Sequence, residues 1–171
     1  MWKFWKRKNW RKYDDTHDGK ALAVAQYMLS RRQEAGAGLT PLQLTKLTYI
    51  AHGHMLARYM RPLYEEEVQA WPLGPMVPSV YRAVRHFCDR CIDAVPGAPV
   101  FDFDPQEIDL MNWVADMYGR LDGIVLAGAM HHPGTPWRIT RDELGKNGPI
   151  SNDLLAYFYG QILRKGRHHA L

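Results

Sequence analysis

Apolar residues recur at helical spacing in separate stretches of this chain, and glycine and proline mark the boundaries between the stretches. Residues 20–34 predict a first helix that ends at the glycine-rich residues 36–38, because glycine accepts the left-handed conformation found at helix ends. A second helix begins at Thr40, Pro41 and Gln43. A threonine cap, a proline in the first position and a glutamine three residues after the cap together form a strong start signal.

The middle of the chain predicts one extended segment between helices. The second helix is expected to stop before Pro62, because a residue that precedes proline disfavours the helical region. Residues 63–71 are expected to be extended or to form a short strand, and a proline- and glycine-rich turn follows. Pro78 then opens a helix that runs to about residue 91. Its expected buried face comprises Val80, Val84, Phe87, Cys88 and Cys91.

The C-terminal part repeats the same start signals. Asp104 and Pro105 open one helix, and Asp122 caps another over residues 123–131. Residues 132–149 are expected to be mainly loop, and Ser151 caps a last amphipathic helix. Leu154, Leu155, Phe158 and Ile162 form the expected inner face of that helix.

These elements predict a mostly α fold: a single compact helical domain of about six helices with one short extended insertion that could pair as β-structure. The expected organisation is an N-terminal arm over residues 1–19, a helical domain over residues 20–163 and a basic C-terminal tail over residues 164–171. The length suits one compact domain.

Basic charge is concentrated at the N-terminus. Residues 1–13 hold six Lys and Arg residues and no acid, and the rest of the chain holds 16 bases and 18 acids. The chain after residue 13 is therefore near neutral, although the net charge of the whole chain is +4. We do not expect this part to be a general nucleic-acid-binding domain.

The arm also interleaves aromatic residues with these bases. Base stacking plus phosphate attraction would suit single-stranded nucleic acid, the same composition would suit an anionic membrane surface, and tryptophans can anchor a protein partner. We expect the arm to bind a partner or target. The candidate partner-binding residues are Trp2, Phe4, Trp5, Trp10, Lys6, Arg7, Lys8 and Arg11.

No histidine pattern predicts catalysis or a cofactor. His52 and His54 lie two residues apart and diverge by about 200° on a helix, so they are poorly placed to share an ion, and we expect one half-buried and one solvated ring. His131 and His132 are suited to proton transfer, but the sequence identifies no partner for them. We expect His131 to have a structural role and to hydrogen-bond a loop backbone.

Neither the cysteines nor the clustered acids predict a site. His86, Cys88 and Cys91 approach a zinc half-site, yet no second ligand cluster lies at suitable spacing, so we expect no metal. Two cysteines inside a predicted helix suit reduced thiols in a cytoplasmic protein, and no apolar run is long enough to span a membrane. Residues 65–67 are three glutamates that alternate sides on an extended segment, which is typical of a solvated edge.

The strongest functional signal is the order of several short fragments. A Lys-Leu-x-Tyr helix with an Ala-x-Gly step leads through an acidic stretch to Ala-Trp-x-x-Gly-Pro and then to a Pro-x-Val-Tyr helix start. In this order, over about residues 20–163, the chain resembles the Panacea domain, a phage- and mobile-element-associated family of antitoxins. The matching residues are Lys46, Leu47, Tyr49, Ala51, Gly53, Arg61, Pro62, Leu63, Glu65, Glu66, Glu67, Ala70, Trp71, Gly74, Pro75, Pro78, Val80, Tyr81, His131, Pro136 and Trp137. Pro72 and the run at residues 130–133 depart from the family pattern.

The resemblance implies a non-enzymatic binding platform. Members of the family look like antitoxins that neutralise unrelated toxins encoded by adjacent genes, and some resemble adaptors that deliver a toxin to a protease. The expected partner is thus a cognate toxin protein, with a protease as a further partner if the chain is an adaptor. Function would then lie on partner-specific surfaces and appended arms.

Two other functions remain open at this stage. One is a phage or mobile-element accessory protein that binds nucleic acid or an anionic membrane through its arm. The other is a small hydrolase that uses His131 or His132. The oligomeric state does not follow from the sequence.

Overall fold

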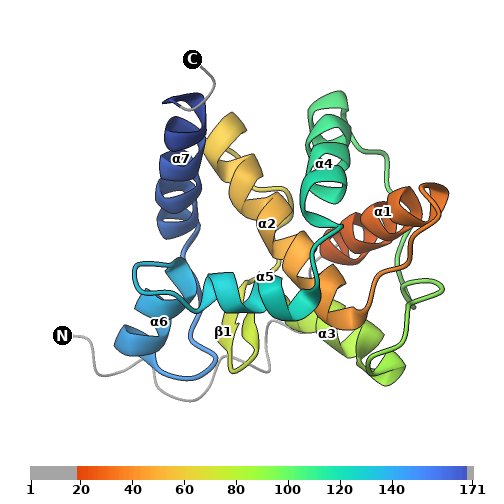
Figure 1. Ribbon diagram of the computed structural model, residues 1–171, viewed down its shortest axis with the longest axis horizontal. Helices are drawn as coiled ribbons and strands as arrows, with labels where there is room; N and C mark the ends of the chain where they lie inside the picture. Colours follow the sequence, from red (N-terminus) through yellow and green to blue (C-terminus); the bar gives the residue numbers. More distant parts are fainter. Residues whose placement is uncertain (1–18, 169–171) are drawn as a thin grey trace.

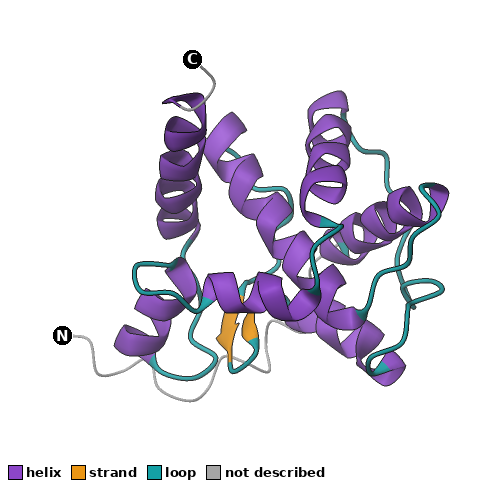
Figure 2. Ribbon diagram, viewed as in Figure 1, coloured by secondary structure: helices purple, strands orange, loops and turns teal. Residues whose placement is uncertain are grey.

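A computed structural model describes residues 19–168, and within that range the protein is a bundle of seven α-helices with one small hairpin (Figures 1 and 2). The elements are α1 (Lys20–Glu34), α2 (Pro41–Tyr59), β1 (Gln69–Trp71), β2 (Gly74–Met76), α3 (Pro78–Val84), the 3-10 turn η1 (Arg85–Phe87), α4 (Pro105–Tyr118), α5 (Gly123–Met130), α6 (Pro136–Leu144) and α7 (Asn152–His168). The predicted mostly α fold is confirmed, and the extended insertion forms a two-stranded antiparallel sheet.

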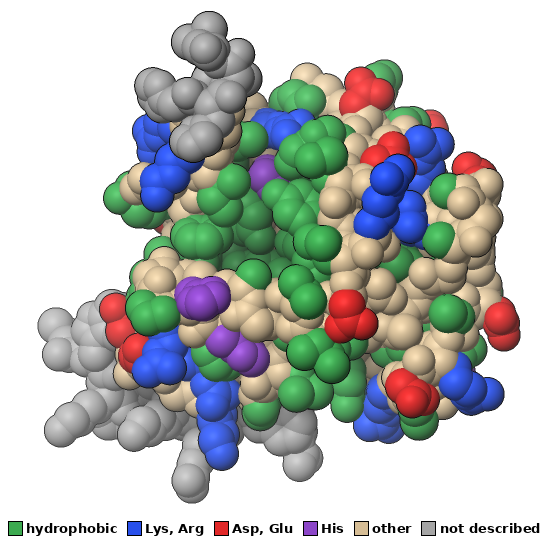
Figure 3. All heavy atoms as spheres, viewed as in Figure 1, with side chains coloured by type: hydrophobic (Ala, Val, Ile, Leu, Met, Phe, Trp, Pro, Cys, Tyr) green, Lys and Arg blue, Asp and Glu red, His purple; other side chains and the backbone are tan. Residues whose placement is uncertain are grey.

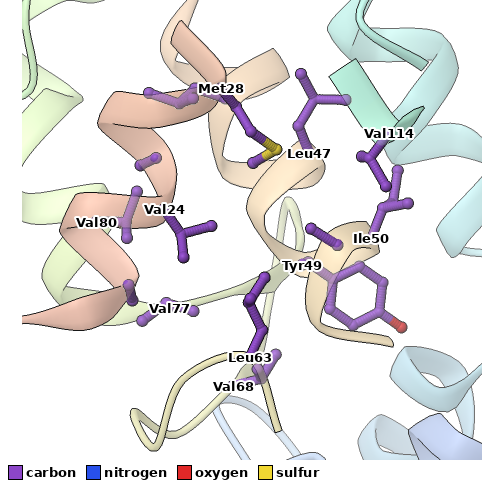
Figure 4. Packing of buried hydrophobic residues seen from close by; sticks show 14 of the residues in the cluster. Val24, Met28, Leu47, Tyr49, Ile50, Leu63, Val68, Val77, Val80 and Val114 are labelled. Carbon is purple, nitrogen blue, oxygen red and sulfur yellow. The ribbon is translucent and has the colours of Figure 1, made fainter. Parts of the chain in front are cut away.

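The helix α2 is the centre of the domain. The side chain of Thr40 accepts a hydrogen bond from Gln43 N at 3.4 Å, and the Gln43 side chain accepts one from Thr40 N at 3.0 Å, so the predicted capping box is present. α1, α4, α5 and α7 all pack against α2 (Figure 1). Buried side chains from α1, α2, α3 and α4 meet in one core (Figure 4). The core explains why α2 is buried along most of its length.

A close approach fixes α7 against α2. A Cβ atom added at Gly53 would lie 2.2 Å from the ring of Tyr159, a distance that no real side chain tolerates. Glycine at this position therefore lets the two helices approach. Tyr159 and Leu155 are buried on the α2 side of α7, whereas Ile162, predicted to face inward, is exposed.

The hairpin is extended by the segment that precedes α7. Ala70 N donates to Gly148 O at 2.9 Å, and Ile150 N donates to Val68 O at 2.8 Å. The open edge of β1 is thus occupied by the protein's own backbone. This pairing places the Trp-Pro-x-Gly turn at the base of the domain, next to α6 (Figure 1).

The predicted helix from Pro78 to about residue 91 is wrong in its second half. α3 ends at Val84, the turn η1 ends at Phe87, and Cys88 has a positive φ of 58°. A non-glycine residue in the left-handed region cannot continue a helix. Val80 and Val84 are buried as predicted, but Phe87 is only half-buried, and Cys88 and Cys91 are exposed.

The expected loop over residues 132–149 contains one helix. α6 begins at Pro136, and the Thr135 hydroxyl accepts a hydrogen bond from Arg138 N at 3.3 Å. A threonine cap before a proline is the same start signal that opens α2. The prolines and the glycine within residues 133–136 favoured a loop in the sequence.

A small charge cluster holds the start of α1 in place. The carboxylate of Glu107 is buried, and Lys20 Nζ lies 2.5 Å and Arg61 Nη1 lies 3.3 Å from it. Arg61 also pairs with Asp104 at 2.6 Å. These contacts hold the start of α1 against the start of α4.

Candidate partner-binding surface

Three helices surround α2 without closing over it. α4, α5 and α7 each pack on α2 but make few contacts with one another. Figure 3 shows the consequence: hydrophobic side chains gather on this face around a hollow between α7, α5 and α4. Large exposed apolar patches of this kind often mark sites of interaction with another molecule.

Aromatic rings from α2, α4 and α7 pack against one another. His54 of α2 is met by Trp113 of α4, with ring centroids 4.8 Å apart, and by Tyr159 of α7, with centroids 4.7 Å apart. The guanidinium of Arg58 lies 4.0 Å from the centre of the Trp113 ring, a cation–π contact. One helical turn beyond Trp113, Met117 is 59% exposed. Aromatic packing thus joins α2, α4 and α7, and Met117 leaves an apolar side chain accessible on α4.

Burial keeps His54 neutral. Loss of hydration, with a smaller contribution from the positive charge of Arg58, lowers the pKa of His54 to about 3. Its Nε2 lies 3.4 Å from the Tyr118 hydroxyl. A neutral, aromatic-packed ring serves here as part of the apolar contact between helices and offers no proton transfer near neutral pH.

A pocket of about 250 Å³ lies beside α7. Its lining is formed by Gly134, Ile139, Leu154, Tyr157, Phe158, Gln161, Ile162 and Lys165. Tyr157 is 63% exposed although it lines the pocket. The outer side of α7 thus offers apolar anchors of the kind found at the centre of protein interfaces.

The helix α5 is apolar on every side. It buries Leu126 and Met130 against the domain, yet Ile124 is 76% exposed and Val125 is 58% exposed. A helix without a polar face is normally covered by protein or lipid. Among residues 19–168 no helix is long and apolar enough to cross a bilayer.

Six of the residues that carry the Panacea resemblance come together elsewhere, in a cluster at the base of the domain. Trp137 Nε1 donates to Trp71 O at 2.7 Å, and the ring of His131 lies over that of Trp137 with centroids 4.1 Å apart. Arg141 Nη1 donates to Ala70 O at 3.4 Å. We call this group the hinge cluster; its members are Lys46, Trp71, Gly74, Pro75, His131 and Trp137.

Lys46 is the most unusual member of the hinge cluster. Lys46 is fully buried, and its Nζ donates a hydrogen bond to Pro75 O at 3.0 Å. Burial lowers the pKa of Lys46 to about 7. A Cβ at Gly74, where φ is 103°, would lie 3.0 Å from that Nζ, so glycine is required both by the backbone angle and by the lysine.

The histidines do not form a catalytic constellation. The pKa of His131 is lowered by burial and by the nearby Lys46 and Arg141, and its buried Nε2 has no hydrogen-bond partner among the described residues. The expected backbone hydrogen bond is therefore not seen for that nitrogen. His52 stacks on Tyr64, with centroids 4.2 Å apart, and bonds Asn152 Oδ1 at 2.9 Å.

The expectation of one solvated histidine on α2 is wrong. Both His52 and His54 are buried, because α2 is enclosed on several sides by helices. Burial lowers the pKa of His52 to about 4. The two rings meet different neighbours, as the angle between them on the helix predicts.

The acidic stretch plays a structural part. Glu66 Oε1 accepts a hydrogen bond from Ala21 N at 2.8 Å and so satisfies the first turn of α1, and Glu67 Oε1 accepts one from Gln69 Nε2 at 2.8 Å. Glu65 is exposed. Within residues 19–168 no group of three or more His, Cys, Asp or Glu side chains is placed to hold a metal ion.

The predicted partner-binding residues of the arm lie outside the described residues. Neither the α5 face nor the hollow was predicted from the sequence. One signal was available: the stretch GIVLAGAM holds no polar side chain and is too short to span a membrane. Such a helix must be either wholly buried or covered by something else.

Comparison with known proteins gives two matches. The family model "Antitoxin SocA-like, Panacea domain" matches residues 44–138, which include α2, the hairpin, α4, α5 and the start of α6. A curated relative, Antitoxin SocA of Caulobacter vibrioides (strain NA1000 / CB15N), is 29% identical over 143 residues, which cover 78% of this chain and 76% of the relative. Comparison with solved structures gives no match. The chain belongs to the SocA-like Panacea-domain antitoxin family.

Proposed function

We propose that this protein is an antitoxin that neutralises a cognate toxin protein by direct, stoichiometric binding. The observation that carries the proposal is the apolar hollow between α4, α5 and α7, in a chain that belongs to an antitoxin family. Met117 is exposed on α4 beside the hollow, and Tyr157 is exposed on the outer side of α7; both suit a protein partner that supplies apolar side chains. Binding there would cover a functional surface of the toxin.

A non-enzymatic role agrees with the chemistry of the buried groups. Lys46 and His131 both lie close to Gly74, and neither lines the pocket beside α7. Neither is paired with a carboxylate among the described residues. A nucleophile or general base also needs an open position for a substrate, and Lys46 is fully buried. The hinge cluster instead holds the turn at residues 71–75.

The test is growth of cells that express the neighbouring gene alone and together with this chain. The proposal predicts arrest by the neighbour and relief by co-expression, followed by co-purification of the two proteins in a fixed ratio. Arrest that this chain does not relieve would contradict the proposal. Relief without a complex, accompanied by faster loss of the toxin, would instead assign delivery of the toxin to a protease.

The basic, aromatic arm supports a second candidate: binding of nucleic acid or of an anionic membrane. Contacts between several bases and phosphates weaken steeply as salt increases. Affinity of the full chain for a single-stranded oligonucleotide or for anionic vesicles should then fall by orders of magnitude on addition of salt. Charge-neutralising substitutions at Lys6, Arg7 and Lys8 should abolish it, and salt-independent binding would contradict this candidate.

A further inference from the structure

The side chains of α7 that line the pocket beside it follow one side of the helix. They stand at positions i, i+3, i+4, i+7, i+8 and i+11, a spacing that repeats along one face over about three turns. We call them the α7 stripe; its members are Leu154, Tyr157, Phe158, Gln161, Ile162 and Lys165. A mostly apolar stripe of this length is the kind of surface against which another helix packs.

The opposite wall of the pocket is short. Among the described residues, only Gly134 and Ile139 line the pocket from outside α7, and α6 lies beside the N-terminal end of α7 (Figure 1). Tyr157 is 63% exposed and Ile162 is 38% exposed. The described part of the chain therefore leaves much of the α7 stripe open to a partner.

The size of the pocket suits inserted side chains better than a free small molecule. Its volume is about 250 Å³, whereas small-molecule sites usually enclose about 300–1,000 Å³. Its lining offers few polar groups, namely the ends of Tyr157, Gln161 and Lys165. A row of apolar anchors from a protein would fill such a pocket without polar groups to orient it.

The two ends of the α7 stripe differ in charge. Arg164 and Lys165 are exposed at the C-terminal end, and no acidic residue follows Asp153 in the sequence. Asp153 itself is exposed in the first turn of α7. Because complementary charges favour association, a partner that lies along the stripe should carry acids beside Arg164 and Lys165.

We infer that the α7 stripe binds an amphipathic helix of the toxin, with acidic residues in the first turn of that helix beside Arg164 and Lys165. This inference rests on the proposed antitoxin function and specifies the part of the toxin that is bound. In such a contact, apolar residues at i, i+3, i+4 and i+7 anchor the helix in the groove.

The toxin helix is expected to run antiparallel to α7. That orientation places its positive N-terminal end next to the negative C-terminal end of α7. Acids in its first turn then stabilise the toxin helix itself and also face Arg164 and Lys165. A parallel helix would need its acids in its last turn, where they oppose its own dipole.

The chain's own arm has a different distribution of residues. Its tryptophans within residues 2–10 are interleaved with bases, which would lie beside Arg164 and Lys165. Its acids lie within residues 14–18, a stretch with no large apolar side chain. The tryptophans of the arm would therefore bring bases rather than acids to the α7 stripe.

The first experiment uses two synthetic peptides as probes for the full-length protein. Each has about 18 residues, enough to form a helix, with leucines at i, i+3, i+4 and i+7. One peptide carries glutamates in its first turn and the other carries lysines there. Fluorescence anisotropy should show that the acidic peptide binds about tenfold more tightly or better. Equal affinities, or no binding of the acidic peptide, would overturn the inference.

Charge reversal on the protein locates the bound peptide. The variant Arg164→Glu with Lys165→Glu should bind the lysine peptide more tightly than the acidic one. Arg85→Glu with Arg90→Glu is the matched control, because it makes the same change of charge at exposed positions in and after η1. An equal effect of both variants would show an unspecific effect of charge and would overturn the assignment to α7.

Loss of apolar anchors separates the stripe from charge alone. Tyr157→Ala with Ile162→Ala should weaken binding of the acidic peptide by about tenfold or more. Both side chains are accessible, so the protein should remain folded. The control Leu73→Ala with Val100→Ala, at exposed positions elsewhere, should bind as the wild type does. Wild-type affinity in the Tyr157 and Ile162 variant would overturn the inference.

Two other occupants of the stripe would give different signatures. If Ile162→Glu speeds tryptic cleavage after Lys6 or Arg7, the arm covers the stripe in the wild type. If sedimentation velocity shows a dimer that Ile162→Glu dissociates, a second copy covers it. Either result would overturn the inference.

The growth assay keeps this inference apart from the antitoxin function. When the wild-type chain relieves arrest by the neighbouring gene, the variant Arg164→Glu with Lys165→Glu should not. Full relief by that variant would overturn the inference and leave the antitoxin function standing. Failure of the wild type to relieve arrest would contradict the antitoxin function itself.

Discussion

The hinge cluster and the apolar face of α4, α5 and α7 use their residues in opposite ways. In the hinge cluster, polar groups are buried and fixed: Lys46 Nζ binds Pro75 O, and Trp137 Nε1 binds Trp71 O. On the apolar face, large hydrophobic side chains such as Ile124 are left in solvent. The first arrangement contributes to folding and the second does not, so the difference separates residues that stabilise this domain from residues available to a partner.

The largest effect should come from Trp137. The variant Trp137→Ala should lose about 3–5 kcal/mol of unfolding free energy, because the side chain is buried and its indole holds the turn. Trp71→Ala should lose less than half as much, because the Trp71 side chain is half-buried and packs beside Tyr81 at the surface. Urea unfolding followed by circular dichroism measures both, and equal losses would remove the special role of the indole bond.

Comparable in size is the pH dependence that Lys46 causes. Its pKa is about 7 in the folded protein and near the ordinary 10.5 in the unfolded chain. Between these values the unfolded chain holds a proton that the folded protein lacks, so stability rises with pH, by at most about 1.4 kcal/mol per pH unit. The same contribution is lost as pH falls to 7.

The variant Lys46→Met lacks the titrating group and serves as the reference. The difference in unfolding free energy between wild type and this variant should change with pH across the window from 7 to 10.5. A constant difference would show that Lys46 is charged in the folded protein. That result would mean that a negatively charged group lies beside the Lys46 ammonium.

A smaller loss is expected at Gly53. The variant Gly53→Ala should lose about 1–3 kcal/mol, because the new methyl group would overlap the Tyr159 ring and push α7 from α2. Gly160→Ala should instead gain about 0.5–1 kcal/mol, since it lies in a helix with open space around it. A stabilising Gly53→Ala would mean that α7 is free to shift, and would weaken the description of the hollow.

Much of the fold follows from local signals in the sequence. The cap, proline and glutamine at Thr40, Pro41 and Gln43 define the start of α2, and the same chemistry defines α4. The helix predicted up to residue 91 failed at Cys88, because apolar spacing carries no information about a left-handed residue. α6 was missed because the prolines and the glycine within residues 133–136 favoured a loop, although Thr135 and Pro136 carry the same start signal as α2.

The candidate surface was harder to predict than the fold. Lysine is rarely buried without a partner charge, so the burial of Lys46 could not be predicted from its residue type. The apolar residues of α5 suggest a core helix, and only the arrangement of α4, α5 and α7 around α2 reveals that half of them face solvent. Exposure depends on the packing of distant segments, which local patterns do not encode.

The central claim is that the apolar face binds the toxin without supporting the fold. It is tested most directly by the growth assay with a double variant, Met117→Glu with Tyr157→Glu, beside a control with Leu73→Glu and Val100→Glu at exposed positions elsewhere. Both variants should keep the wild-type thermal midpoint. The control should still relieve toxin arrest, and the Met117 and Tyr157 variant should not. Full relief by both variants would contradict the central claim.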